Sequence, residues 1–252
     1  MVYFIGAGPG AADLITLRGK AILERAEVIL WADTLVNPEI LNLARPAARI
    51  YPTGGMALEK QVEVMVEAVK SGQVVARLHT GDPSIYGATR EQMRALDTAG
   101  VAYAVVPGVS SVFAVAAALK TELTQPEVSQ TVILTRAAGR TPVPPSEALK
   151  GLAAHRATLV LLLSANLLEG AVAELLAGGY SPDTPAALVY RASWPEEKIL
   201  RTPLSEISKA AKEANINRQA ILIVGEALAA GATRSRLYST RLQPGCFVGD
   251  ER

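Results

Sequence analysis

Three short loop-like segments contain the residue types that could do chemistry in this chain. They read GAGPGAADLIT (6–16), TGDPSIYG (80–87) and VPGVSS (106–111), and each follows a short apolar run. Their glycines allow close backbone approach to a ligand, and they add hydroxyl groups, the Asp82 carboxylate and the Tyr86 ring. Ser110 and Ser111 have no histidine and acid in a suitable context for nucleophilic catalysis. His79 and His155 lack the companions of a metal site. The three segments therefore predict a small-molecule site without a protein-bound metal.

The first segment also matches the dinucleotide-binding pattern G-x-G-x-x-G/A, and Asp33 ends the next apolar run, VILWAD. Such a site needs the glycine turn to run straight into a helix, whose free N–H groups bind the pyrophosphate. Here the helix-start signal is Thr16, with five residues between it and Gly10, and Pro9 removes one N–H donor. The spacing disfavours an NAD-dependent dehydrogenase, which stays open as an alternative, as does a small-molecule binding protein without chemistry.

The other two segments also have purely structural interpretations. Asp82 precedes a proline and is a natural turn opener, while Ser110 or Ser111 could cap the next helix. TGDPSIYG lacks the lysine of a phosphate-binding P-loop. The functional interpretation is that Gly81, Asp82 and Ile85 line a ligand at the end of a strand.

The elements that must position these loops alternate regularly in the first half. Strand-like runs VYFIG, EVILWA, ARIYPT, VVARLHT and AYAVVPG are separated by helical segments. This alternation predicts a five-stranded parallel sheet, with a ligand cleft outside the carboxyl ends of its strands. The polar stretch 120–130 suggests a domain junction. Five more strand-like runs follow it: TVILT, ATLVLLLS, AALVYRAS, EKILRT and QAILIVG. The turn WPEE between AALVYRAS and EKILRT predicts a hairpin, and therefore a mixed second sheet.

We therefore expect two α/β domains, residues 1–119 and 120–240, followed by a tail over 241–252. The chain has 252 residues, a net charge of +1 and one cysteine, Cys246. This charge gives no general attraction for nucleic acid or an anionic membrane. A single cysteine suits a reducing cytoplasm, and we find neither a signal peptide nor an apolar run of about 20 residues.

With the three loops in place, residues 2–239 resemble the tetrapyrrole methylase family, the class III methyltransferases that use S-adenosylmethionine. The family's loops read like GAGPG-x-x-x-L-x-T, GDP-x-x-(Y/F)-G and V-(P/E)-G-(V/I)-(S/T)-S/A, here in the same order. Within the family, three longer segments are similar to sequences of the branch that methylates C-11 of precorrin-4, or of its cobalt form, in cobalamin biosynthesis. These segments are TLVNPEIL (34–41), RLHTGDPSIYGATREQM (77–93) and RASWPEEKILRTPLSEI (191–207). Family members acting on uroporphyrinogen III or diphthine remain alternatives.

The resemblance implies a cofactor, S-adenosylmethionine, in a cleft between the two domains, a tetrapyrrole substrate and a homodimer. The cofactor-binding residues it implies are Pro9, Thr80, Gly81, Asp82, Ile85, Ser110, Ser111, Leu163 and Ala192. Any cobalt would belong to the substrate.

Methyl transfer to carbon depends on positioning and desolvation more than on a strong catalytic group. Tyr86 could face the sulfonium, and Asp82 could orient the methionine part or take a proton. Asp33 could reach the macrocycle or merely cap a turn. The substrate carboxylates call for arginines, and the candidates are Arg90, Arg136 and Arg191, each of which is otherwise an ordinary surface residue.

Overall fold

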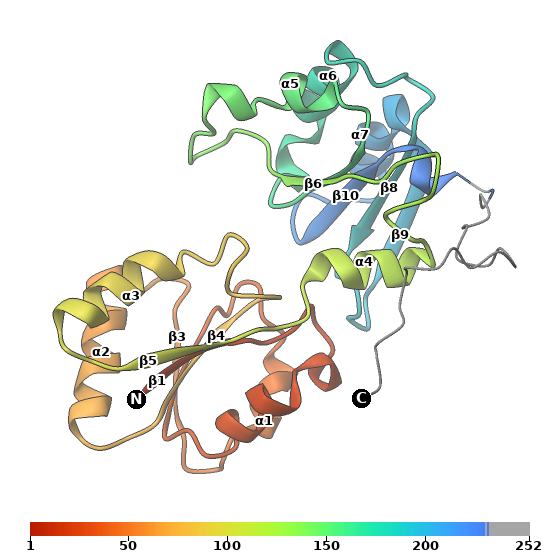
Figure 1. Cartoon of the computed structure of the whole chain (residues 1–252). Coiled ribbons are helices and arrows are strands. Elements are labelled where there is room, and N and C mark those ends of the chain that lie inside the picture. The colour runs from red at the N-terminus through yellow and green to blue at the C-terminus, as the bar shows by residue number, and fades with distance from the viewer. Residues whose placement is uncertain (230, 232–252) are drawn as a thin grey trace, which may run out of the picture.

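The computed structural model describes residues 1–229 and 231, and its strands form two five-stranded sheets (Figure 1). The first sheet has the order β3-β2-β4-β1-β5, and all its strands run parallel. Its strands are β1 (Val2–Gly6), β2 (Val28–Trp31), β3 (Arg49–Pro52), β4 (Val75–His79) and β5 (Tyr103–Val106). All five strands predicted for the first half are thus confirmed.

Helices cover both faces of the first sheet. Ile22 and Leu23 of α1 (Leu17–Leu23) pack on one face. Met65 of α2 (Leu58–Lys70) and Leu96 of α3 (Thr89–Thr98) pack on the other. The chain therefore leaves the neighbouring strands β1 and β4 toward opposite faces, and this divergence opens a crevice at their carboxyl ends.

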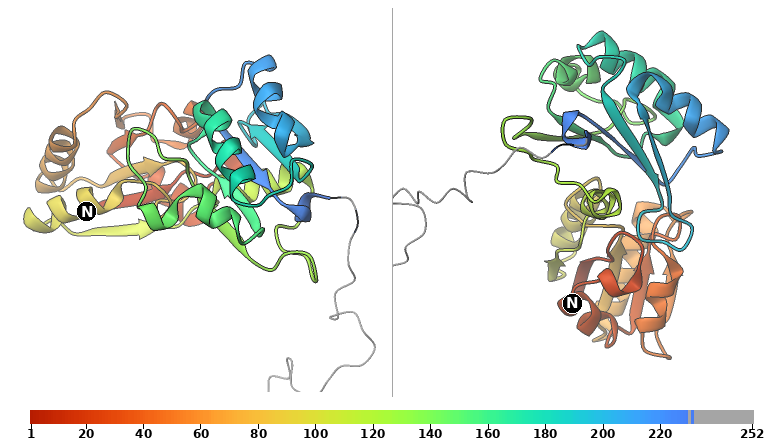
Figure 2. Two further views of the ribbon diagram at one scale, coloured as in Figure 1. Left: turned by 90° about the horizontal axis from the view of Figure 1, so that it is seen from above. Right: turned by 90° about the vertical axis from the view of Figure 1, so that its right-hand side faces the viewer.

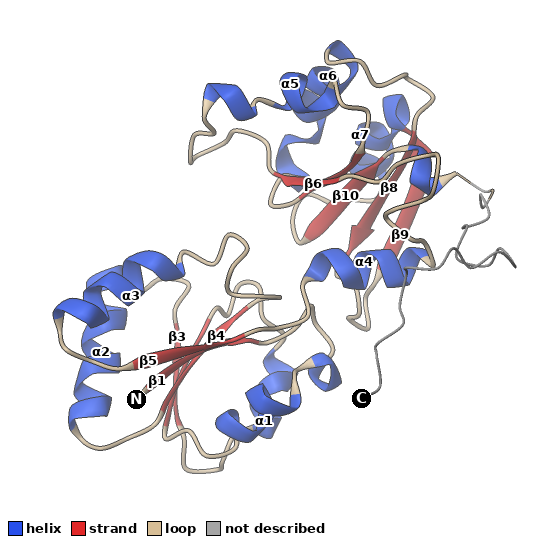
Figure 3. Ribbon diagram, viewed as in Figure 1, coloured by secondary structure: helices blue, strands red, loops and turns tan. Residues whose placement is uncertain are grey.

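The second sheet has the order β6-β7-β10-β8-β9, in which the neighbours β6 and β7 pair in parallel and the other neighbours pair antiparallel. Its strands are β6 (Val132–Thr135), β7 (Thr158–Leu161), β8 (Pro185–Tyr190), β9 (Lys198–Pro203) and β10 (Ala220–Val224). The predicted mixed sheet and the β8–β9 hairpin are both confirmed. The helices α5 (Leu149–Ala153), α6 (Leu168–Ala177) and α7 (Leu204–Glu213) cover one face of this sheet (Figure 3).

The helix that follows β5 covers the other face of the second sheet. Val112, Val115 and Leu119 of α4 (Ser111–Leu119) share one buried cluster with Val160 of β7 and Val189 of β8. The α4 helix thus links the two sheets in space as well as in sequence. The predicted domain boundary between residues 119 and 120 stays a proposal, and the predicted tail lies outside the described residues. None of the described helices has the length and hydropathy needed to cross a membrane.

Candidate active site

The three loops of the sequence analysis meet at the carboxyl ends of β1, β4 and β5, and they meet through glycines. Gly81 N donates to Gly8 O at 2.8 Å, and Gly8 N donates to Gly81 O at 3.3 Å. A Cβ on Gly6 would lie 2.5 Å from Gly108 Cα and 2.6 Å from Gly81 O. Gly6 and Gly108 are therefore required because the backbones of the other loops pass too close for a side chain, whereas Gly81 has a φ of 60° that favours glycine.

The first loop is not a phosphate cradle. Thr16 caps α1 by accepting a hydrogen bond from Gly19 N at 3.1 Å, as predicted, and the helix begins well after the glycines. The free N–H groups of α1 are therefore not presented by the glycine turn, and this geometry disfavours the dinucleotide interpretation.

Asp82 joins the second loop to the third. Its Oδ2 accepts from Gly108 N at 2.8 Å, and its Oδ1 accepts from the backbone N–H of Ser84 at 2.8 Å and from the Ser84 hydroxyl. Burial raises the pKa of Asp82, but these hydrogen bonds from Ser84 and Gly108 outweigh burial and hold the pKa below its usual value. The carboxylate is consequently ionised and engaged in holding the loops.

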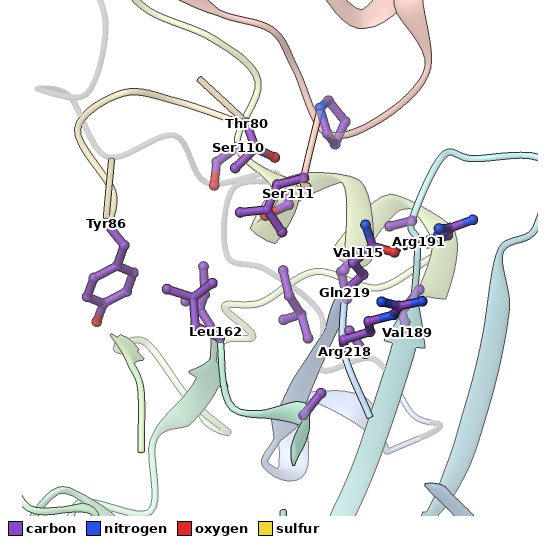
Figure 4. A pocket seen from close by; sticks show the side chains of 18 of the residues that line it. Thr80, Tyr86, Ser110, Ser111, Val115, Leu162, Val189, Arg191, Arg218 and Gln219 are labelled. Atoms are coloured by element: carbon purple, nitrogen blue, oxygen red, sulfur yellow. Dashed lines mark hydrogen bonds between the residues drawn. The ribbon is translucent and has the colours of Figure 1, made fainter. Parts of the chain in front are cut away.

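The loops open into a cavity of about 680 Å³ whose walls come from both sheets (Figure 4). The first half contributes the loops after β1, β2, β4 and β5. The second half contributes the ends of β7 and β8 and the start of β10. The lining residues include all nine predicted cofactor residues: Pro9, Thr80, Gly81, Asp82, Ile85, Ser110, Ser111, Leu163 and Ala192.

The structure separates the other predicted site residues into two groups. Tyr86 and Arg191 line the cavity, on opposite sides in Figure 4. Arg90 is exposed on α3 and does not line it. Arg136 is also absent from the lining and donates to the carbonyls of Thr141 and Pro142 at 2.8 and 2.7 Å.

Asp33 lies in a second, shallower hollow with Lys60 and the loop after β3. Its Oδ1 accepts a hydrogen bond from Gly54 N at 2.6 Å, so the turn-capping interpretation describes one of its contacts. The next residue, Thr34, lines the main cavity, so consecutive residues of the chain line the two hollows.

Tyr86 and Ser110 both line the cavity, and each has a local feature that bears on its role there. Tyr86 has a φ of 52°, in the left-handed region, and its ring is about half exposed. Burial raises the pKa of the Tyr86 phenol, so it is neutral at physiological pH.

Ser110 caps α4 by accepting a hydrogen bond from Val112 N at 3.3 Å, and it also lines the cavity. The capping and ligand-facing interpretations of Ser110 are therefore compatible.

Several lining residues were missed from the sequence. Trp194 lies in the β8–β9 turn, and Arg218 and Gln219 immediately precede β10. Because β10 runs antiparallel to β7 and β8, the segment before it reaches the same edge as their carboxyl ends. An antiparallel direction for the last strand could have indicated Arg218 and Gln219. The segment RASWPEE, already noted for its similarity to the family, could have indicated Trp194.

The profile of the tetrapyrrole (corrin/porphyrin) methylases matches residues 1–208. A precorrin-4 C(11)-methyltransferase of Mycobacterium tuberculosis is 51% identical over 240 residues, covering 94% of this chain and 96% of the relative. A solved cobalt precorrin-4 methyltransferase superposes with a TM-score of 0.88 at 47% identity, covering 90% of this chain and 95% of that one.

A second solved relative was crystallised with S-adenosylhomocysteine. It is a uroporphyrin-III C-methyltransferase from Thermus thermophilus, 29% identical with a TM-score of 0.76, covering 90% of this chain and 98% of that one. The three-loop geometry, the profile match over most of the chain and these relatives agree. The chain is a methyltransferase and belongs to the tetrapyrrole methylase family.

Proposed function

We propose that this protein transfers a methyl group from S-adenosylmethionine to C-11 of precorrin-4 or of cobalt-precorrin-4. The observation that carries the proposal is the convergence of the nine predicted cofactor residues, from both halves of the chain, on one cavity. Relatives named for this reaction, at about half identity over nearly the whole chain, support the choice of substrate.

The cavity suits a cofactor with an apolar ring system and a polar tail. Apolar side chains form much of its wall: Pro9, Ile85, Val115, Leu162, Leu163, Val189, Ala192 and Ile221. Hydroxyls of Thr80 and Ser110 and the amide of Asn166 add hydrogen-bonding groups. Its volume of about 680 Å³ lies within the range of ligand sites.

The residues around the cavity position and desolvate the reactants. When bound, S-adenosylmethionine would supply an electrophilic methyl group on a sulfonium. Asp82 keeps the second and third loops at a fixed spacing, because its carboxylate bridges them. The exposed ring of Tyr86 presents a face that suits a cationic centre.

For the substrate, the structure favours Arg191 over Arg90 and Arg136, because Arg191 alone of the three lines the cavity. Arg218 joins Arg191 on the same side (Figure 4), and together they suit a carboxylate of the macrocycle. Asp33 is our candidate for accepting a substrate proton, because the next residue, Thr34, lines the cavity.

We also expect a cytoplasmic homodimer. The exposed apolar side chains of Val105, Phe113 and Leu134 support association with a second copy, since exposed apolar groups favour burial in an interface. Sedimentation equilibrium would measure the association, and a monomer at micromolar concentration would contradict it.

The decisive experiment incubates the protein with labelled S-adenosylmethionine and, separately, precorrin-4, cobalt-precorrin-4 and uroporphyrinogen III. NMR of the product then reads the methyl position, which we expect at C-11. In parallel, we expect S-adenosylhomocysteine to raise the melting temperature and NAD to leave it unchanged. Transfer to uroporphyrinogen III alone, or stabilisation by NAD alone, would contradict the proposal.

A further inference from the structure

The turn between β8 and β9, residues 191–197, reaches from the second sheet to the glycine-rich first loop (Figure 2, right). Trp194 Nε1 donates to Pro9 O at 3.1 Å. Ala11 N donates to Ser193 Oγ, also at 3.1 Å. Two hydrogen bonds therefore connect loops that lie more than 180 residues apart in sequence.

The indole of Trp194 lies directly against Gly10. A Cβ built on Gly10 would overlap Cδ1 and Nε1 of the indole, and it would lie 3.0 Å from Ser193 Oγ. The absence of a side chain at Gly10 is thus explained by the tryptophan that packs there, and the two residues form one fitted contact.

Contacts within the 191–197 turn fix the position of this indole. Arg191 and Ser193 have φ values of 48° and 69°, which non-glycine residues keep only where the surroundings enforce them. Trp194 N donates to Arg191 O at 2.9 Å, and Ser193 N donates to Glu197 Oε2 at 2.7 Å. The Arg191 guanidinium lies 4.8 Å from the centre of the Trp194 ring.

A second connection between the two halves lies beside the first. Arg191 Nε donates to Gln219 Oε1 at 2.7 Å, and Gln219 Nε2 donates to Thr34 O at 2.9 Å. The residues of both connections that line the cavity are Pro9, Thr34, Arg191, Trp194 and Gln219. The two connections are therefore part of the cavity wall.

From these contacts we infer that Trp194 is a positioning residue for methyl transfer. Together with Gln219 it sets the spacing between the first-half loops and the second-half wall of the cavity, and thereby the alignment of methyl donor and acceptor. The inference rests on the proposed function. Because in-line transfer depends steeply on alignment, a wider spacing lowers kcat more than it raises KM.

Two variants disturb the contact from opposite sides. Trp194→Phe keeps an aromatic ring and removes the N–H donor to Pro9, whereas Gly10→Ala pushes the indole away. We expect each to lower kcat about tenfold and to change KM for S-adenosylmethionine less than about threefold, with an unchanged circular dichroism spectrum. Trp31→Phe is the matched control. Trp31 packs in the first-sheet core and does not line the cavity, so its replacement leaves kcat within about twofold.

A double-mutant cycle separates positioning from mere stabilisation. In a Trp194→Ala background the overlap of a Cβ at position 10 with the indole is gone and the Ser193 hydroxyl is the remaining close neighbour, so Gly10→Ala causes a much smaller further loss of kcat than it causes alone. A purely structural contact would lower the melting temperature of the variants and leave the kcat of the folded enzyme unchanged. Unchanged kcat in Trp194→Phe and Gly10→Ala, or additive losses in the cycle, would overturn the inference.

The contact can also be tested without turnover. In a Trp31→Phe background Trp194 is the sole tryptophan, because the chain has two. Gly10→Ala should then shift its emission to the red and increase quenching by acrylamide, and unchanged emission would overturn the contact itself. Failure of the parent enzyme to methylate any of the macrocycles would instead overturn the proposed function.

Discussion

Asp82 and His79 show how differently two ionisable residues near the site behave. Asp82 is held ionised by hydrogen bonds from Ser84 and Gly108, so it ties two loops together. His79, at the end of β4, is buried beside Arg77, and its Nε2 has no hydrogen-bond partner among the described residues. Burial, followed by the charge of Arg77, lowers the pKa of His79 to about 3. The lowered pKa values therefore keep the Asp82 carboxylate charged and the His79 imidazole neutral near pH 7.

Asp82→Ala should weaken S-adenosylhomocysteine binding about tenfold, because the third loop loses its tie to the second and Gly108 N is left unpaired. Isothermal titration calorimetry measures the affinity. Ser84→Ala, which removes one donor and keeps the Gly108 contact, serves as the milder control. Unchanged affinity in Asp82→Ala would reduce Asp82 to a turn residue.

Because the pKa of His79 is lowered in the folded chain, we expect the free energy of unfolding to depend on pH. The unfolded chain binds a proton at this histidine below about pH 6.5, whereas the folded chain does so only near pH 3. The free energy of unfolding should therefore fall as the pH drops from 6.5 toward 3, by up to about 1.4 kcal/mol per pH unit from this group.

Urea unfolding at pH 7 and pH 5 measures this contribution. We expect His79→Gln to remove it and His155→Gln, at the exposed second histidine, to keep it. The same pH dependence in His79→Gln and the parent would contradict the assignment.

At the scale of elements, the site depends on how three strand ends meet. Gly6, Gly81 and Gly108 come from three different loops, and their backbones are in mutual contact. The loops therefore form one unit, because a change in one displaces the other two. The same proximity explains why Asp82 of the second loop reaches the third.

Gly108→Ala should destabilise the protein by on the order of 3 kcal/mol, because its Cβ would overlap Gly81 O and lie 2.6 Å from Gly6 Cα. Thermal or urea unfolding measures the change. Gly170→Ala, in α6 with open space around it, is the control and should be neutral or slightly stabilising. Equal stability of Gly108→Ala and the parent would show that the loops separate easily.

The elements themselves could be predicted because their signals are local. The ten strands, the Thr16 cap and the β8–β9 hairpin follow from apolar runs and turn residues within short windows. The contacts that Trp194 and Gln219 make could not be predicted, since their partners Pro9 and Thr34 lie 185 residues away. Arg90 and Arg136 looked equivalent to Arg191 in sequence, and only the folded chain distinguishes them.

At the scale of the whole molecule, two sheets share one cavity and are joined by α4 and by the 191–197 turn. The α4 sequence is apolar on nearly all sides, so its pattern did not say which sheet it would cover. In the structure it completes the core of the second sheet, although it follows the last strand of the first. By sequence order α4 therefore belongs to the first half of the chain, whereas by packing it belongs to the second.

The position of α4 determines where two members of the family can be recombined. A chimaera joined between residues 119 and 120 would place a foreign helix on the second sheet, and Val112, Val115 and Leu119 would have to fit side chains they did not evolve with. A crossover between Gly108 and Ser110 would keep that helix with its own sheet, but it would pass through the loop that Gly6 and Gly81 enclose. Exchange of halves thus succeeds only between parents that match either at α4 or at the glycine contact.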